Sequence, residues 1–341
     1  MRCLRYLALG AVTIMLAACA NGSAQALPQP LASWTEFRHL HGVVDLAGPR
    51  SDGSFLVAAF GRLFLLHGGT LTAFARGAGG YQTSAGAEPY LVITSSVPVR
   101  GERCSFARDT AFAIAPGARP SVIVISPQGR AQRFASLPPG MFLSGVAFDA
   151  TGRFGHRLLV TAGLGTRTTV FGIGCDGRPS SVAANAPVVE GGIVVAPATF
   201  GRFGGDLIAQ NEKNGLVYAV TPAGTVVIVA RSDLPAGGDI GVESAGFVPP
   251  HAAAAYLADR LTPGNKHPGD DAILRLSAAA LARAGIRAGD LLVATEGGAN
   301  TIDVRCAAAC TVRLVAAGPT VAHAEGHIVF ASPASAAAVT I

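Results

Sequence analysis

Lysine, aromatic and charged side chains are all scarce in this chain of 341 residues. Lysine occurs only at Lys213 and Lys266, aromatic residues make up 6% of the sequence, and charged residues make up 14%. Binding to nucleic acid depends on a basic stripe with aromatic side chains on which bases can stack. Because the arginines are scattered, the net charge of +5 does not indicate a nucleic-acid partner.

The common motifs of nucleophilic catalysis and nucleotide binding are also missing. The sequence contains neither a G-x-S-x-G motif nor a Walker A motif. One match to G-x-G-x-x-G covers residues 172–177, but Arg178 and Pro179 follow it in place of a helix. A dinucleotide site needs a helix N-terminus at that point to bind the pyrophosphate. The match therefore predicts a turn, and the sequence does not name a reaction.

Helical periodicity is nearly absent, while short β-branched runs separated by Gly, Pro, Asp and Asn recur throughout the chain. The stretch 154–161 returns in similar form at 203–210. The unit around the second copy, 190–234, contains four apolar runs separated by turn residues. Four strands in about 45 residues is the blade period of a β-propeller, so the sequence predicts an all-β propeller. A β-sandwich would not require this repeat, and a solenoid repeats over fewer residues.

The spacing of the units predicts six four-stranded blades, with five or seven as the alternatives, closed by pairing of the N-terminal and C-terminal segments. The last interval is too long for one blade. It includes an expected helical insertion at 277–284, with Ser277 as its N-cap, and strands at 291–295 and 311–316 that are candidates for a further blade. The predicted units begin near His41, Glu88, Ser144, Glu190, Glu243 and Glu325.

Two of these units carry a family resemblance. Residues 144–149 followed by Gly152, and Val217-Tyr218 leading to the turn 221–224, resemble propellers of the NHL-repeat, gluconolactonase and streptogramin-lyase type. The single tryptophan and the lack of Trp-Asp dipeptides distinguish the chain from Trp-Asp-repeat propellers. The resemblance extends over most of residues 40–330. By analogy with streptogramin lyases, it implies a divalent metal and His327 as the general base.

Glutamates stand at the start of several predicted blades, where inner strands converge on the axis of a propeller. Carboxylates crowded around one channel repel each other, and a bound cation or raised pKa values relieve that repulsion. We therefore expect a Ca²⁺-type site, the alternative being separate glutamates on a solvated rim. The candidate ligands are Glu88, Glu190, Glu243 and Glu325, with Asn211, Glu212 and Asp259 as further oxygen donors.

Histidines gather near the predicted closure of the ring. His323, Glu325 and His327 alternate with small residues, so on a strand they would project from one face. His39 and His41 alternate in the same way. If the two termini pair, these side chains could form a site for Zn²⁺ or another transition metal. The alternative is two unrelated histidine segments at a surface seam.

The N-terminus has the pattern of a lipoprotein signal peptide. Arg2 and Arg5 precede the apolar run 7–16, and small residues precede Cys19. The pattern resembles the lipobox, which implies cleavage before Cys19 and acylation of its thiol; an ordinary secretory segment or membrane anchor is the alternative. We predict a signal peptide at 1–18, a lipidated cysteine and tether at 19–35 and a propeller at 36–335. The expected location is the cell envelope, at the periplasmic face of the outer membrane or the cell exterior, with the lipid as membrane anchor.

Four further cysteines remain, an even number suited to disulfides in an oxidising compartment. Cys306 and Cys310 flank three alanines between two β-rich runs, so a bridge at a hairpin is geometrically reasonable and leaves Cys104 with Cys175. Metal binding is the alternative, but neither spacing is the C-x₂-C of zinc sites.

Three functions remain open at this stage. The first is an envelope lipoprotein whose propeller binds a small ligand or a protein partner at the channel mouth. The second is a metal-dependent enzyme of the lactonase or lyase kind with Ca²⁺ or another divalent cation in the channel. The third is a structural assembly module.

Overall fold

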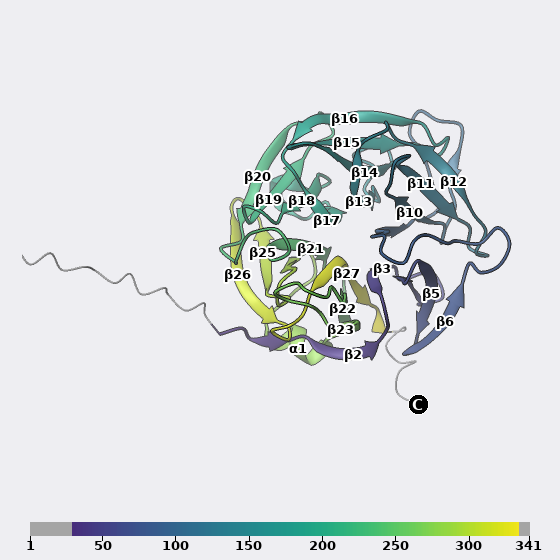
Figure 1. Cartoon of the computed structure of the whole chain (residues 1–341). Coiled ribbons are helices and arrows are strands. Elements are labelled where there is room, and N and C mark those ends of the chain that lie inside the picture. The colour runs from purple at the N-terminus through teal and green to yellow at the C-terminus, as the bar shows by residue number, and fades with distance from the viewer. Residues whose placement is uncertain (1–28, 334–341) are drawn as a thin grey trace, which may run out of the picture.

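The computed structural model describes residues 29–333, whose regular secondary structure is almost entirely β-strand. Figure 1 shows the strands grouped into sheets around a common axis, with β3, β13, β17 and β27 near the centre and β12, β16, β20 and β26 at the rim. Four of the sheets contain four strands each, and a fifth contains nine. The chain is therefore a β-propeller.

The first four blades follow one another in chain order, each as an antiparallel sheet. The strands of the first two are β3 (Val43–Ala47), β4 (Phe55–Ala59), β5 (Arg62–His67), β6 (Thr70–Phe74), β7 (Leu91–Ile93), β10 (Ala111–Ala115), β11 (Ser121–Ile125) and β12 (Ala131–Ser136). Those of the next two are β13 (Phe142–Phe148), β14 (Leu158–Leu164), β15 (Arg167–Ile173), β16 (Pro179–Ala186), β17 (Glu190–Val195), β18 (Leu207–Asn211), β19 (Leu216–Val220) and β20 (Val226–Arg231). A hairpin of β8 (Val97–Pro98) and β9 (Ser105–Phe106) and the short 3-10 helix η1 (Gly201–Phe203) lie in the connections.

The nine-stranded sheet is two blades joined edge to edge. Its inner strands β21 (Val242–Phe247) and β27 (Ala324–Ala331) pair at one position only, Ala245 with His327. On one side of this junction lie β24, β25, β26 and β1, and on the other lie β22, β23 and β2. Counting the halves separately gives six blades. The remaining strands are β1 (Ala32–Ser33), β2 (Thr35–His39), β22 (Ala254–Asp259), β23 (Ala272–Ser277), β24 (Leu291–Thr295), β25 (Thr301–Cys306) and β26 (Cys310–Ala317).

The last two blades exchange strands along the chain. After β21 the chain forms β22 and β23 of the sixth blade, returns through helix α1 (Ala278–Arg283) to add β24, β25 and β26 to the fifth, and ends with β27. The strands expected at 291–295 and 311–316 thus complete the fifth blade and do not form a further one. Helix α1 confirms the predicted helix. Ser277 is its N-cap, as predicted, because its hydroxyl accepts a hydrogen bond from the Ala280 N–H.

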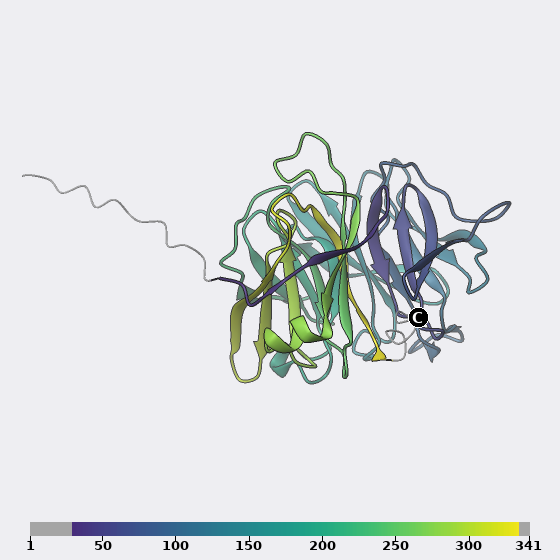
Figure 2. The same ribbon diagram turned by 90° about the horizontal axis from the view of Figure 1, so that it is seen from below.

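Closure of the ring also differs from the prediction. The N-terminal β2 pairs with β23 at the outer edge of the sixth blade, whereas the C-terminal β27 is the innermost strand of that blade. β2 and β27 therefore share a blade without pairing directly, while the short β1 pairs in parallel with β26 at the edge of the fifth blade. Figure 2 shows α1 and the end of β27 on one face of the propeller, and the long loop after β22 on the other.

The core consists of apolar layers between neighbouring blades. The inner strands are largely buried; all five residues of β3 and all eight of β27, for example, are buried. The outer strand β6 leaves most of its residues partly or fully exposed. A blade therefore needs a neighbour on each side to remove its apolar faces from water, which explains why the repeat appears as an unbroken ring.

The folded unit begins earlier than predicted. Trp34 is buried, and its indole N–H donates to the Thr301 hydroxyl at 2.8 Å. Residues 32–35 therefore belong to the propeller and not to a tether. The predicted signal peptide at 1–18 and Cys19 lie outside the described residues. Within 29–333, no helix has the length and apolar character needed to cross a membrane.

The four cysteines of the propeller form two disulfides. Cys104 pairs with Cys175, and Cys306 pairs with Cys310 at the turn between β25 and β26. This is the pairing that the sequence favoured over a metal site.

Candidate functional site

One end of the propeller axis is strongly acidic. The innermost strand of each blade starts at this end, and the second strand, counted outward from the axis, finishes there. Residues at the start of innermost strands and just after second strands therefore converge. Carboxylates from four blades gather at this point, which we call the acidic mouth. Its six glutamates are Glu88, Glu190, Glu212, Glu243, Glu296 and Glu325. Charge repulsion within this group helps to raise the pKa of each of them except Glu325.

Glycines make the close approach of these strands feasible. Gly191 and Gly326 directly follow Glu190 and Glu325, and both have a positive φ, of 80° and 69°. A Cβ on Gly191 would lie 2.2 Å from Cγ of Glu243. Any other residue would therefore push this glutamate out of the mouth.

Tyr90 joins two of the glutamates below the surface. Its hydroxyl oxygen lies 2.7 Å from Oε1 of Glu243 and 2.9 Å from Oε2 of Glu325. The hydroxyl has one proton, so satisfying both contacts requires a carboxyl that has kept its own proton. Burial, together with the charges of Glu325 and Glu296, raises the pKa of Glu243 well above its ordinary value. In the absence of a cation, Glu243 is therefore the carboxyl that holds this proton.

Two positively charged groups face the glutamates. Nη1 of Arg260 contacts Oε1 of Glu88 and lies 3.2 Å from Oε1 of Glu325. Nε2 of His323 lies 2.8 Å from Oε1 of Glu296 and 3.6 Å from Oε1 of Glu325. Burial alone would lower the pKa of His323, but these two carboxylates raise it to about 10. His323 is therefore positively charged in the absence of a competing cation.

The remaining negative charge is not balanced. Burial raises the pKa of Glu190 to about 8, with Glu212 and Glu325 adding to the effect. Burial also raises the pKa of Glu296 to about 7, although its hydrogen bond with His323 opposes the increase. Carboxyls with such raised pKa values are typical of a site that is built for a cation or for proton transfer.

The side chains at the mouth fit a divalent cation. Glu296, His323 and Glu325 form one buried set, and Glu212, Glu243 and Glu296 form another; within each set the donor atoms lie within 4.8 Å of one another. Oε2 of Glu296 is buried without any hydrogen-bond partner. Leaving a carboxylate oxygen buried and unpartnered is costly, and a cation would remove that cost.

The structure thus brings together the four glutamates predicted to form a ring, along with Glu212 and His323. Asp259 lies behind the mouth, where its Oδ1 accepts the backbone N–H of His323 at 2.8 Å. Asn211 instead shapes a loop, because its amide donates to the Val188 carbonyl.

The N-terminal histidines do not join the site, so the proposed closure cluster and the assignment of His41 as a metal ligand are wrong. The Nδ1 atom of His41 lies 2.6 Å from Oδ2 of Asp271, and its ring is exposed. His39 is exposed on β2. His39 ends β2 at the outer edge of the sixth blade, and His41 lies in the turn that leads to β3, with its ring against that of Phe60.

His327 lies on the axis but differs from a general base. Its Nδ1 is 3.0 Å from Oδ2 of Asp45, and its Nε2 is 3.1 Å from the Val146 carbonyl and 3.2 Å from the Ile193 carbonyl. Every one of these partners is an acceptor, so both ring nitrogens hold protons. Burial would lower the pKa of His327, but Asp45 and the two carbonyls raise it. The imidazolium has no free lone pair, and the assignment of His327 as the general base is not supported by this geometry.

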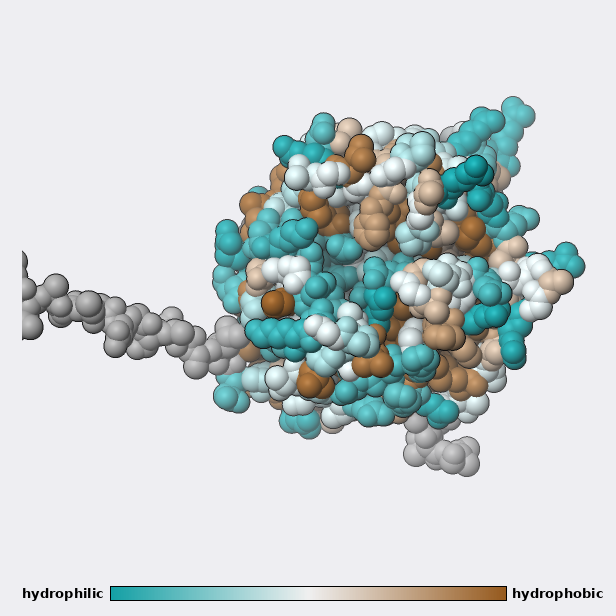
Figure 3. Space-filling model, in the orientation of Figure 1, coloured by the Kyte–Doolittle hydropathy of each residue, from teal (hydrophilic) through white to brown (hydrophobic). Residues whose placement is uncertain are grey.

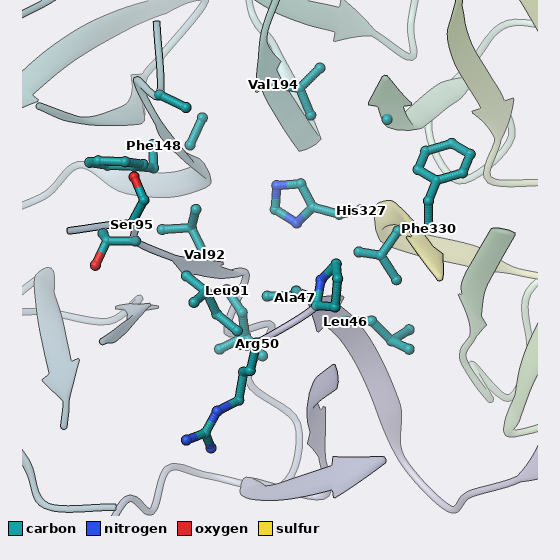
Figure 4. Close-up of a pocket in the computed structure, with 18 of the residues that line it drawn as sticks. Leu46, Ala47, Arg50, Leu91, Val92, Ser95, Phe148, Val194, His327 and Phe330 are labelled. Atoms are coloured by element: carbon teal, nitrogen blue, oxygen red, sulfur yellow. The ribbon is translucent and has the colours of Figure 1, made fainter. Parts of the chain in front are cut away.

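A separate cavity of about 620 Å³ opens at the opposite end of the axis. Figure 4 shows the His327 ring near its centre, surrounded by apolar residues that include Leu46, Val92, Phe148 and Phe330. The central ion pair of Asp45 and His327 thus lies between an apolar cavity and the acidic mouth.

Sequence reasoning missed three important side chains of the mouth: Glu296, Arg260 and Tyr90. A signal for the first two exists, because Glu212, Arg260 and Glu296 all directly follow the second strand of a blade. Aligning the ends of second strands would have revealed this shared position. Tyr90 carries no comparable pattern.

Comparisons with known proteins indicate only a general likeness. No family model matches the chain, and no curated protein matches it. Similar solved structures include a streptogramin B lyase (11% identity, 83% of this chain, 72% of the other, TM-score 0.45) and a putative gluconolactonase (11%, 74%, 93%, 0.37). A protein from Lactobacillus plantarum is similar at 11% identity over 84% of this chain and 87% of the other, with a TM-score of 0.46. The propeller assignment rests on the sheets described above.

Proposed function

We propose that this propeller binds a divalent cation at the acidic mouth and uses it to hold an oxygen-containing small ligand. The observation that carries the proposal is Oε2 of Glu296, which is buried, unpartnered and surrounded by other carboxylates. A solvated rim of separate glutamates would not bury such an oxygen, because water would hydrogen-bond to it.

Glu212, Glu243 and Glu296 would hold the cation. When bound, a divalent cation supplies Lewis acidity, which polarises a carbonyl or lowers the pKa of a water molecule. The all-carboxylate character of these ligands favours a hard ion such as Ca²⁺ or Mn²⁺.

Glu190 is the residue best suited to move a proton beside this cation. Its side chain is only partly buried, so the carboxyl can exchange protons with a ligand in the mouth. A pKa of about 8 means that protonated and ionised forms both exist near neutral pH. A group with a pKa near the working pH is an efficient general acid or base. This supports a lactonase-like or lyase-like reaction over simple binding.

The rim offers apolar contacts for the rest of a ligand. Figure 3, viewed along the axis, shows a hydrophilic centre with separate hydrophobic patches around it. Five large hydrophobic side chains are exposed at this end of the propeller. They adjoin either the start of an inner strand or the end of a second strand, and they are Phe60, Phe142, Leu164, Leu261 and Val321. We therefore expect a ligand with an oxygen-rich part for the cation and an apolar part for the rim.

Titration calorimetry of the full chain with CaCl₂ and MnCl₂ tests the cation site. We expect saturable binding that is lost in Glu296→Gln and kept in Glu36→Gln, a matched change at an exposed glutamate of β2. If neither ion binds to the wild type, the proposal is refuted and a structural module becomes the better description.

Reaction with a panel of lactones then separates an enzyme from a binding protein. Hydrolysis breaks the ring C–O bond, adds one water and releases a proton from the new carboxylic acid, which a pH indicator detects. Cation-dependent proton release that Glu190→Gln abolishes would identify an enzyme. Cation binding with ligand retention and no turnover would identify a binding protein.

We also propose that the chain is anchored to the cell envelope through Cys19. The signal-like segment 1–18 and the two disulfides, which suit an oxidising compartment, support this location. Expression of the full chain with a labelled fatty acid in a Gram-negative host tests it. The label should enter the wild type and be absent from Cys19→Ala; an unlabelled wild-type protein would refute the proposal.

A further inference from the structure

The two sets of potential ligands at the acidic mouth share one residue. Glu296 belongs to the set with His323 and Glu325 and also to the set with Glu212 and Glu243. All five side chains are buried, with at most 7% of their surface exposed. Glu296 follows the second strand of the fifth blade, so it lies between ligands from the fourth, fifth and sixth blades.

The two oxygens of Glu296 have different surroundings. Oε1 lies 2.8 Å from Nε2 of His323, whereas Oε2 has no partner. When two neighbouring ligand atoms each lie about 2.1 Å from one ion, the two atoms are roughly 3 Å apart from each other. The observed distance from Nε2 of His323 to Oε1 of Glu296 is close to this value. Oε1 is therefore placed for an ion beside His323, and Oε2 remains free for a second ion.

The chemistry of the two sets also differs. The set with His323 combines one imidazole with two carboxylates, a mixture that suits Zn²⁺, Mn²⁺ or Fe²⁺. The set with Glu212 and Glu243 offers only carboxylate oxygens, which suit Ca²⁺, Mg²⁺ or Mn²⁺. Sites that bridge two ions through a carboxylate place them about 3.5–4 Å apart.

Charge balance favours two ions over one. When all six glutamates of the mouth are ionised, Arg260 and a protonated His323 offset only two negative charges. Ligation by His323 would require its neutral form and would leave five charges unbalanced. One divalent cation would still leave three unbalanced negative charges in a largely buried site, whereas two divalent cations would leave one such charge.

We propose that the acidic mouth binds two divalent cations that share the Glu296 carboxylate, one beside His323 and Glu325 and the other beside Glu212 and Glu243. This proposal rests on the proposed cation-binding function. With both carboxyls ionised, the Tyr90 hydroxyl can donate to only one of Glu243 and Glu325, and Arg260 orients Glu325 from the side. Mn²⁺ is the most informative probe because it suits both ligand sets.

The number of bound Mn²⁺ ions tests this proposal separately from the cation site itself. Equilibrium dialysis of the full chain followed by metal analysis should give two ions per chain. One ion would overturn the two-ion proposal and leave the proposed function intact. No bound ion would overturn both.

Variants assign each ion to its ligands. His323→Gln should retain one Mn²⁺ and still bind Ca²⁺, Glu212→Gln should retain one Mn²⁺ and still bind Zn²⁺, and Glu296→Gln should lose both sites. Glu36→Gln should retain two. Circular dichroism checks that each variant is folded; if one is not, the wild-type stoichiometry still decides.

Electron paramagnetic resonance of the wild type loaded with two Mn²⁺ ions tests whether they share a carboxylate. Ions bridged by Glu296 should show a spin-coupled spectrum that becomes a simple six-line signal in His323→Gln. A six-line signal from two ions in the wild type would mean separate sites and would overturn the shared-carboxylate proposal.

Discussion

Replacing Asp45 by Asn should destabilise the propeller more than any conservative surface change. Asp45 has no exposed surface, and its carboxylate accepts backbone N–H groups of Leu46, Leu91 and His327 at 2.6–2.8 Å. It is also the negative partner of the His327 imidazolium, which in turn donates to carbonyls of the third and fourth blades. The Asp45–His327 pair therefore joins five of the six blades at the axis, three of them through the carboxylate itself.

The size of the effect follows from the buried charge. Removing one partner of a buried ion pair costs about 3–5 kcal/mol, mostly because the other charge is left uncompensated. Asparagine retains the volume and one acceptor oxygen, so we expect the lower end, about 3 kcal/mol. The melting temperature should fall by about 5–10 °C.

Urea unfolding of Asp45→Asn, followed by fluorescence of the single buried tryptophan, Trp34, measures this loss. The matched control is Asp176→Asn, which changes an exposed aspartate and should alter stability by less than about 0.5 kcal/mol. The pKa of His327 is raised in the fold. The ion pair of its imidazolium with Asp45 therefore stabilises the fold fully at pH values below the unfolded pKa of about 6.5, and this stabilisation declines as the pH rises through the folded pKa. The gap between wild type and variant should therefore be larger at pH 5.5 than at pH 9. A variant as stable as the wild type, or a gap that widens at alkaline pH, would refute this reasoning.

Three further predictions concern the mouth and the disulfides. Without a cation, the free energy of unfolding measured by urea titration should fall as the pH rises from 5 to 9, because the pKa of Glu190 is raised to about 8 and the fold keeps a proton that the unfolded chain has lost. Millimolar Ca²⁺ should reverse this loss of stability. A free energy of unfolding that rises over this pH range would contradict the prediction. Glu190→Gln should lower turnover of any lactone substrate by about 100-fold, while calorimetry shows cation binding changed by less than threefold. Replacing both cysteines of the Cys104–Cys175 bridge by Ser opens a loop of 71 residues and should lower the free energy of unfolding by about 4 kcal/mol. The same change at the four-residue Cys306–Cys310 loop should lower it by about 2 kcal/mol. Equal losses in thermal unfolding of the two variants would count against the loop-entropy argument.

The positions of the inner strands could be predicted from sequence with good accuracy. The predicted unit starts at Ser144, Glu190, Glu243 and Glu325 all lie within two residues of the start of an inner strand. This success has a local cause, because a buried strand needs a continuous apolar run and turns need Gly, Pro, Asn or Asp. The helix after β23 was predictable for the same reason, since Ser277 caps it through a contact with a residue three positions away.

The partners of those strands could not be predicted in the last two blades. The sequence places β22 directly after β21, as in the earlier blades, yet β22 pairs with β27, more than sixty residues later. Both arrangements bury the same apolar strands between neighbouring blades. Only the packing of the complete ring distinguishes between them.

The sequence by itself determined the strand repeat and the presence of glutamates where inner strands begin, because both depend on spacing along the chain. Among three possible disulfide pairings it favoured the one that the structure contains. Only the tertiary structure decided which side chains meet. It brought Glu296 and Tyr90 into the mouth, paired His41 with Asp271, and surrounded His327 with acceptors. Contacts between blades join residues separated by up to 282 positions, as in the pair of Asp45 and His327. Such contacts depend on how the ring closes, and no local pattern records that closure.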